Sequence, residues 1–290
     1  MTENEEYINK LIEAFKFTIA LFNKHKLKWF VGGGTCIGAV RHHGLIPWDD
    51  DVDLYMPRDD YNKLLNLKED LNETNYELVS WHGKKTTIPF AKIVNKNTTI
   101  WETKYRPYLS GVFIDIFPMD LSDRRIDELV VDLDYYNKLL RKYRSSMSSY
   151  TLKDILQLAF HKKRSLVKEG IESLFTKSYS KKYLNKLISL DNKNNCQHGD
   201  YYVLFSACFV YSYEKEIFKK EWFDDYIIMP FEDFEVRVPI GYHEYLSHVY
   251  NDYMKLPPKE ERYPRHDRYY INLSERKTIK EIINIIKNNA

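Results

Sequence analysis

The sequence predicts an α+β fold in which a mixed β-sheet is flanked by helices. Three observations support this prediction: an amphipathic helical pattern near the N-terminus, short apolar runs bounded by turn residues over the first 120 residues, and a mostly helical, basic segment after them. The composition has 43% hydrophobic and 30% charged residues but only ten Gly and ten Pro. Such a composition is typical of a globular protein and argues against disorder.

The first half of the chain supplies the expected sheet. Apolar side chains at three- and four-residue intervals predict a helix at residues 5–24. Alternating or continuous apolar runs then predict strands, with glycine and proline at the turns between elements. In order, we expect a strand at 27–31, a glycine turn at 32–34, a helix at 35–41, a strand at 52–56, a helix from 57 to 71, and strands at 76–81, 88–94 and 111–117.

The second half is expected to be more helical and to pack on the first half. Residues 123–190 show a helical, basic pattern, residues 225–239 a hairpin, and residues 242–250 a helix. A charged, aromatic tail with two prolines follows at 257–270. No internal repeat or low-complexity linker separates the halves, so one domain over 1–290 is expected, with a core at 27–120 and a C-terminal part at 200–290 packed on it.

The near-neutral net charge of +2 conceals a basic block at 137–186. Thirteen Lys and Arg stand there against three acidic residues, a net of +10 that leaves −8 for the remainder. A block of this kind attracts polyanions such as a membrane face, a lipid-linked phosphate substrate or nucleic acid. The alternative is a helical segment whose basic face is merely solvated.

Neither a secretory signal nor a membrane span is evident, so we expect a cytoplasmic protein. The opening residues, MTENEEYINKLIEAF, are acidic and amphipathic, and no run approaches about 18 apolar residues. Three widely spaced cysteines favour a reducing compartment over a disulfide framework. Cys196, His198 and Cys208 are a weak alternative as part of a zinc site, because their spacing is irregular.

An acidic motif, "IPWDDDVDLYMPRDDY" at 46–61, points to a metal site. Asp51 and Asp53 are two residues apart, so on a strand they share one face. Paired carboxylates suit Mg²⁺ or Mn²⁺, which would bridge substrate phosphates. Asp115, inside the apolar run "VFIDIF", is the candidate for a third acid from a neighbouring strand. The alternative for Asp115 is a salt bridge to a nearby Lys or Arg.

The glycine turn supplies a candidate anion site. Gly33 and Gly34 would let backbone N–H groups approach a phosphate at the start of a helix. Arg41, two helical turns further on, could add a forked donor to the same phosphate, or it could be a surface residue.

Three stretches carry a family resemblance. "GGGTCIGAVRHHGLIPWDDDVDLYMPRDDY", "FIDIFPMD" (113–120) and "YNDYMKLPPKEERYPRHD" (250–267) resemble the motifs of the LicD family, phosphotransferases of the nucleotidyltransferase superfamily that include bacterial phosphocholine transferases. The resemblance runs from about residue 27 to 270 and implies a nucleotidyltransferase-like mixed sheet. One departure is Asn251 in "YNDYM", where relatives commonly carry Gly, and it concerns a turn geometry.

The resemblance also implies roles for individual residues. Asp51, Asp53 and Asp115 would be catalytic and would hold Mg²⁺ or Mn²⁺, with Asp115 acting as a ligand or as a general base. Asp49 and Asp50 would be outer acceptors that orient Arg41 or His42. The residues expected to bind substrate are Gly33, Gly34, Thr35, Arg41, Trp48, Lys255, Arg265 and His266.

The implied reaction is transfer of phosphocholine from CDP-choline, or a related CDP-alcohol, to a sugar hydroxyl, with release of CMP. The acceptor would be a lipid-linked or surface glycan precursor, as in lipopolysaccharide or teichoic acid, at the inner membrane face. Phosphoethanolamine or ribitol phosphate remain open as the transferred group, and Trp48, Trp101, Tyr105 and Tyr108 are aromatic candidates for a choline pocket. The alternatives are a nucleotidyltransferase that attacks the α-phosphate of an NTP and a non-catalytic glycan or choline binder. Nucleic-acid binding is not expected, because tyrosines are not interleaved with the basic block as a stacking platform requires.

Overall fold

The computed structural model describes residues 2–81, 86–206, 212–264, 266 and 268–288, and it contains the predicted mixed sheet flanked by helices. The helices are α1 (Glu3–Lys24), α2 (Gly33–Ile37), α3 (Arg58–Leu65), α4 (Ile126–Met147), α5 (Leu152–Phe160), α6 (Arg164–Thr176), α7 (Ser180–Asn194), α8 (Tyr242–Tyr250) and α9 (Ile279–Asn288). The strands are β1 (Phe30–Val31), β2 (Asp53–Pro57), β3 (Tyr76–Val79), β4 (Ala91–Asn95), β5 (Thr99–Trp101), β6 (Phe113–Ser122), β7 (Tyr201–Val203), β8 (Ile217–Lys219), β9 (Tyr226–Phe231), β10 (Phe234–Pro239) and β11 (Tyr270–Asn272).

Within the described residues, seven strands form the main sheet. Five of them run in the order β1-β2-β6-β4-β3, and β7 and β8 extend the sheet from the far half of β6. The β2 and β6 strands pair in parallel, whereas the other neighbours in the sheet are antiparallel. The long β6 strand therefore lies beside β2 at its start and beside β7 at its end.

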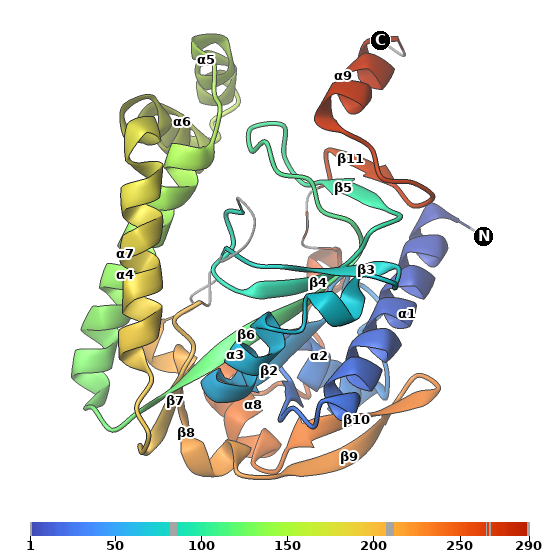
Figure 1. Cartoon of the computed structure of the whole chain (residues 1–290), viewed down its shortest axis with the longest axis vertical. Coiled ribbons are helices and arrows are strands. Elements are labelled where there is room, and N and C mark those ends of the chain that lie inside the picture. The colour runs from blue at the N-terminus through green and yellow to red at the C-terminus, as the bar shows by residue number, and fades with distance from the viewer. Residues whose placement is uncertain (1, 82–85, 207–211, 265, 267, 289–290) are drawn as a thin grey trace.

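Helices cover the sheet on two sides (Figure 1). The α1 helix begins with a capping box formed by Thr2 and Glu5, and it buries Leu11, Phe15 and Phe22 in the main core. On the other side α4 and α7 pack on each other and on β7, with Leu133 and Val203 in a second core. The helical segment predicted at 123–190 is confirmed as α4 to α7.

Two small ribbons complete the molecule. The predicted hairpin is confirmed as β9 and β10, which pack on the main core through Phe231 and Val236. The second ribbon pairs β5 with β11, two segments far apart in the sequence, and the sequence patterns did not predict it. Beyond the tail, the chain thus returns at β11 to pair with β5.

The described residues include no helix that is both long enough and apolar enough to cross a bilayer.

Candidate active site

A row of three charged side chains crosses the middle of the main sheet. Asp53 on β2 is the register partner of Asp115 on β6, and Asp115 is in turn opposite Lys92 on β4. Residues at one register level point to the same face, and neighbouring strands lie about 4.8 Å apart. The structure therefore brings Asp53 and Asp115 together, as the sequence predicted, and adds a cation that the sequence analysis did not identify.

The Lys92 ammonium is the counter-ion of Asp115. Its Nζ lies 2.9 Å from Asp115 Oδ1 and donates a hydrogen bond to Oδ2 at 3.3 Å, and both side chains are buried. The salt bridge left open in the sequence analysis is thus present. Among the described residues Asp115 Oδ1 receives no hydrogen bond with good geometry, and its close neighbour is the Lys92 ammonium.

The acidic loop before β2 places its aspartates in two different environments. Asp50 is buried; its Oδ1 lies 3.0 Å from His266 Nδ1, and its Oδ2 accepts a hydrogen bond from Arg268 at 2.8 Å. Asp49 instead lies beside Asp51 and faces the glycine turn. The expectation that Asp49 and Asp50 orient Arg41 or His42 stays a prediction, and the structure adds that Asp50 contacts His266 and Arg268 of the tail.

The glycine turn packs directly against these carboxylates. A Cβ atom at Gly33 would lie 2.8 Å from Asp53 Oδ2, and one at Gly34 would lie 2.6 Å from Asp49 Oδ2. Gly33 also has a φ of +47°, which favours glycine. Its N–H donates to the Tyr245 hydroxyl at 2.9 Å, so a phosphate bound at Gly33 would have to replace this hydrogen bond.

Thr35 fixes the start of β2. Its Oγ1 accepts a hydrogen bond from the Asp53 N–H at 2.9 Å, and the side chain is buried. The predicted substrate contact of Thr35 is therefore accompanied by a structural role that locks the strand carrying Asp53 to the turn.

Burial and mutual repulsion perturb the acids of this site. Burial, reinforced by the charge of Asp51, raises the pKa of Asp49 to about 8. Burial and the charges of Asp51 and Asp115 raise the pKa of Asp53 well above its ordinary value. Burial likewise raises the pKa of Asp115, but Lys92 opposes this effect and the result is about 6. The site thus concentrates more negative charge than its own cations compensate.

His266 is held as a cation beside the acidic loop. Burial alone would lower its pKa, but the hydrogen bond to Asp50 and the charges of Asp51, Asp50 and Asp115 outweigh burial and raise the pKa to about 9. Its Nε2 lies 3.6 Å from Asp51 Oδ2. His266 is therefore a positive charge at the rim, as a residue that binds an anionic substrate should be, and it is less suited to be a metal ligand while protonated.

The other predicted substrate residues lie further from the acids or outside the described residues. The Arg41 guanidinium donates to the backbone carbonyls of Tyr253 and Lys255, so the predicted phosphate contact would compete with these bonds. The Lys255 side chain is exposed. Trp48 packs under the Arg262 guanidinium, 5.2 Å from its ring centroid. Arg265 lies outside the described residues.

The candidate choline-binding aromatics have other packing partners. Trp101 donates to the Arg106 carbonyl and meets Tyr269 edge to face, while Tyr105 stacks on Tyr150 at 4.3 Å. Tyr108 is largely buried against another small apolar cluster. For the weak zinc alternative, Cys196 Sγ lies 4.0 Å from Asp123, and Cys208 lies outside the described residues.

The donor set fits a divalent cation. Asp50, Asp51 and His266 bring potential ligand atoms within 4.8 Å of one another, but Asp50 is already bonded to His266 and Arg268. In the described part of the chain, Asp49 and Asp53 form no ion pair, although both are half-buried and adjoin Asp51. Carboxylate oxygens that lack counter-ions are the ligands that Mg²⁺ and Mn²⁺ take. We therefore assign the best fit to Asp49, Asp51 and Asp53, with Asp115 at the edge.

For two residues of the site, Lys92 and Asp49, the sequence contained a pattern from which they could have been predicted. Lys92 stands between Ala91 and Ile93 in an apolar run, which is the same signal that singled out Asp115. Asp49 extends the alternate-residue spacing of Asp51 and Asp53 by one step. The role of Arg268 had no local signal, because it depends on the return of the tail.

This fold and site define a class of protein, a nucleotidyltransferase-type enzyme with an acidic strand facing a glycine turn. Residues 26–164 match the family model described as LicD/FKTN/FKRP, nucleotidyltransferase domain. The chain is also 32% identical, over 249 residues, to the lipopolysaccharide cholinephosphotransferase LicD of Haemophilus influenzae. The matched region covers 85% of this chain and 89% of that protein. The chain belongs to the LicD family.

More limited similarity extends to two rickettsial proteins. An uncharacterized protein of Rickettsia prowazekii is 35% identical over 66 residues, 23% of this chain and 25% of that protein. An uncharacterized protein of Rickettsia typhi is 31% identical over 75 residues, 26% of this chain and 24% of that protein.

Proposed function

We propose that this protein is a phosphocholine transferase that depends on a divalent metal ion. It would move phosphocholine, or a related phospho-alcohol, from a CDP-linked donor to a sugar hydroxyl of a lipopolysaccharide-type glycan and release CMP. The observation that carries the proposal is the half-buried cluster of Asp49, Asp51 and Asp53 against the glycine turn, with too little positive charge of its own. The similarity to a relative named for cholinephosphate transfer to lipopolysaccharide supports the choice of substrates.

Acidic and basic residues of the site would have different roles in the reaction. A bound divalent ion would supply positive charge to the diphosphate of the donor and to the departing CMP. Asp49, Asp51 and Asp53 would hold that ion. His266 and Arg268 would keep Asp50 in place and present positive charge at the rim, where phosphoryl oxygens gain charge in the transition state.

Asp115 is placed to accept the proton of the attacking sugar hydroxyl. Its pKa of about 6 lies nearer to neutrality than that of an ordinary aspartate, which suits a general base. Lys92, whose ammonium lies 2.9 Å from Oδ1, orients the carboxylate. In this proposal the ion pair between Lys92 and Asp115 is part of the machinery and does not argue against it.

The test is a product assay with the purified protein, Mg²⁺, CDP-choline and glycan acceptors, followed by phosphorus NMR. We expect CMP and a choline-bearing glycan, and we expect Asp51→Asn and Asp53→Asn to reduce turnover at least about a hundredfold. Asp200→Asn, at an exposed position, is the matched control and should leave turnover unchanged.

Other products would favour the alternatives. Release of pyrophosphate from CTP or ATP would identify a nucleotidyltransferase. Binding of choline or glycan that is unaffected by Asp51→Asn, with no product from any donor, would identify a non-catalytic binder.

A further inference from the structure

The α5 and α6 helices form a hairpin with two apolar faces. We call residues 151–177 the α5–α6 hairpin. On its inner face Ile155 and Leu158 of α5 pack with Tyr150, and Leu166 and Val167 of α6 pack against the same cluster. These contacts are sufficient to hold the two helices together. The outer apolar side chains therefore need a separate explanation.

The outer face of α5 is an exposed apolar stripe. Leu152, Leu156 and Phe160 follow each other at four-residue intervals and are 70%, 71% and 84% exposed. On α6, Leu174 and Phe175 add to the exposed apolar surface, and Phe175 is 74% exposed. Large apolar side chains gathered on one element of a protein surface mark an interaction site rather than random decoration.

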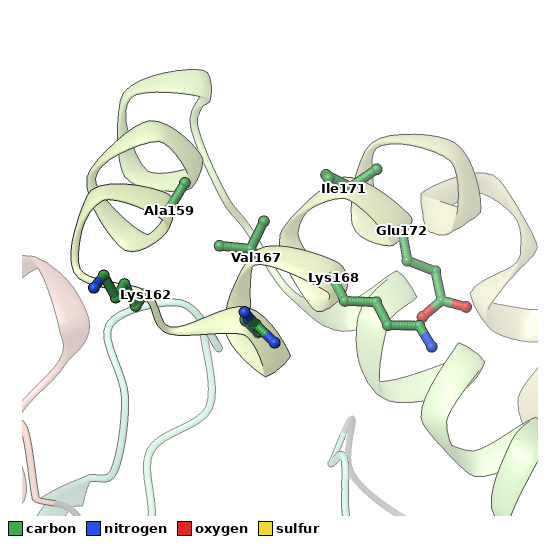
Figure 2. A pocket seen from close by; sticks show the side chains of 7 residues that line it. Ala159, Lys162, Val167, Lys168, Ile171 and Glu172 are labelled. Atoms are coloured by element: carbon green, nitrogen blue, oxygen red, sulfur yellow. The ribbon is translucent and has the colours of Figure 1, made fainter.

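The groove between the helices combines apolar groups with three basic groups and one acidic group (Figure 2). It is an open hollow of about 750 Å³ between the end of α5 and the first turns of α6. The residues that line it are Ala159, Val167, Ile171, Lys162, Arg164, Lys168 and Glu172.

The charges of the hairpin are sorted between its two sides. Each of its three acidic residues contacts the rest of the protein: Asp154 pairs with Lys104 at 3.0 Å, Glu169 pairs with Arg106 at 3.0 Å, and Glu172 accepts a hydrogen bond from Ser145 at 2.9 Å. The basic residues of the turn point to solvent; these are Lys162, Lys163 and Arg164. In the described part of the chain none of the three forms an ion pair, so the hairpin exposes both apolar side chains and uncompensated positive charge.

We propose that the α5–α6 hairpin lies on the surface of an anionic lipid bilayer. Leu152, Leu156, Phe160 and Phe175 would enter the boundary between headgroups and acyl chains, and the basic turn would meet lipid phosphates. The charge pattern favours this occupant over a second copy of the chain, because two hairpins face to face would bring like charges together. Within the basic block at 137–186, the part that contacts the bilayer is this hairpin.

Ion pairs join the hairpin to the loop that follows β5, and this loop leads toward the candidate active site through the β5–β11 ribbon. Lys104 and Arg106, which pair with the hairpin, belong to the loop that follows β5. The β5 strand pairs with β11, directly after the segment that carries His266 and Arg268. Figure 1 shows α5, α6 and the β5–β11 ribbon at the same end of the molecule. Contact with lipid would thus bring a lipid-linked acceptor near the site, and only this consequence rests on the proposed function.

Vesicle sedimentation tests the inference. The full chain is mixed with vesicles of phosphatidylcholine alone or with about 30% phosphatidylglycerol, and we expect binding to the anionic vesicles that weakens as salt rises. Leu156→Gln with Phe160→Gln should weaken binding about tenfold or more, and Lys162→Glu with Lys163→Glu should do the same. The matched controls are Val131→Gln, an apolar position on α4 that is 66% exposed, and Lys68→Glu with Lys219→Glu, which change the net charge equally.

Three outcomes would overturn the inference: no binding of the parent protein to anionic vesicles, equal loss in the control variants, or a dimer that Leu156→Gln with Phe160→Gln dissociates. The circular dichroism of each variant shows whether it is folded. Release of CMP with a detergent-dispersed acceptor should be unchanged in the hairpin variants, because the hairpin does not touch the acids. Loss of lipid binding with normal turnover, or the reverse, therefore separates this inference from the proposed function.

Discussion

The buried ammonium of Lys92 lowers the electrostatic cost of burying the acidic group beside it. Its ammonium contacts Asp115 on one side and lies 3.2 Å from the centroid of the Phe113 ring on the other. Burial alone would lower the pKa of Lys92, but Asp115 and the other nearby charges outweigh burial and raise it. The pair is therefore retained in its charged form at neutral pH.

We expect Lys92→Met to destabilise the protein by about 3–5 kcal/mol, because it leaves Asp115 buried without a counter-ion. The double variant Lys92→Met with Asp115→Asn should recover most of this loss. Urea unfolding of the parent, both single variants and the double variant measures the coupling. Equal and additive losses would show that the pair is not coupled.

Asn251 adopts a backbone conformation that glycine tolerates better. It caps α8 with φ +60° and ψ −113°. We expect Asn251→Gly to raise the free energy of unfolding by about 1 kcal/mol, because the strain of a side chain at this φ disappears. Thermal unfolding measures the gain.

The control for this prediction is Asn66→Gly at the end of α3, where φ is −88°. No strain is relieved there, and glycine should lower the stability slightly. Equal effects at both positions would contradict the backbone explanation.

At the scale of elements, a buried polar network joins the helical layer to the sheet. Arg58 at the start of α3 makes two hydrogen bonds to Asp120 on β6, at 2.7 and 2.9 Å. Asp191 on α7 accepts a hydrogen bond from the Tyr136 hydroxyl of α4 at 2.9 Å and lies 3.9 Å from Arg58. Four elements thus meet in one network, in which Arg58 contacts Asp120 and Asp191 and Tyr136 contacts Asp191.

This network should give the stability a pH dependence. Burial raises the pKa of Asp191 from 3.8 to about 7, although Arg58 opposes the shift. The folded protein then holds a proton that the unfolded chain releases, so the contribution of Asp191 is fully present below about pH 4 and is lost as the pH rises through about 7. The Asp191→Asn variant does not lose stability in this way. Its free energy of unfolding minus that of the parent should therefore rise across that window by up to about 4 kcal/mol.

Urea unfolding at several pH values across this window checks the prediction. Asp200→Asn, an exposed position, should show a difference from the parent that does not vary with pH. A relative stability of Asp191→Asn that stays constant or falls as the pH rises would contradict the assignment of the shift to Asp191.

At the scale of the whole molecule, metal and donor should stabilise the folded chain together. Mg²⁺ or Mn²⁺ with CDP-choline, at about a hundred times the dissociation constant, should add about 2.7 kcal/mol and raise the midpoint of thermal unfolding by several degrees. EDTA should abolish the shift. Asp53→Asn should start from a higher midpoint than the parent, because it removes a buried charge, and should show no shift. An unchanged shift in Asp53→Asn would exclude this carboxylate as a ligand.

The sequence predicted the elements with strong local patterns. The α1 helix, the strand that carries Asp53, the strand that carries Asp115 and the β9–β10 hairpin all lie where periodicity and turn residues placed them. Their register could not be predicted, because the pairing of Asp53 with Asp115 and of Asp115 with Lys92 depends on contacts between distant segments. The family resemblance pointed to the acids as a group, and the structure brings them together, but the resemblance did not separate Asp50, which has counter-ions, from Asp49 and Asp53.

The elements that the sequence did not reveal are short or non-local. The β5 and β11 strands have three residues each and pair across about 170 residues of sequence, so neither has a pattern long enough to recognise. The helix after the glycine turn was predicted to continue to Arg41, but it widens into a π-helix at Gly38–His42. A Cβ atom at Gly38 would lie 2.5 Å from the Gly44 carbonyl, a close approach that only the folded loop shows.

The bond between Asp50 and His266 spans 216 residues, and this distance sets an order of events during synthesis. The acidic loop is synthesised early. His266 and Arg268, which neutralise Asp50, are synthesised only after most of the protein. Until then the aspartate has to remain hydrated, since burying it alone would be too costly. Pairing of the tail with the loop is therefore expected late, and a nascent chain stalled before His266 would carry an Asp50 that lacks this partner.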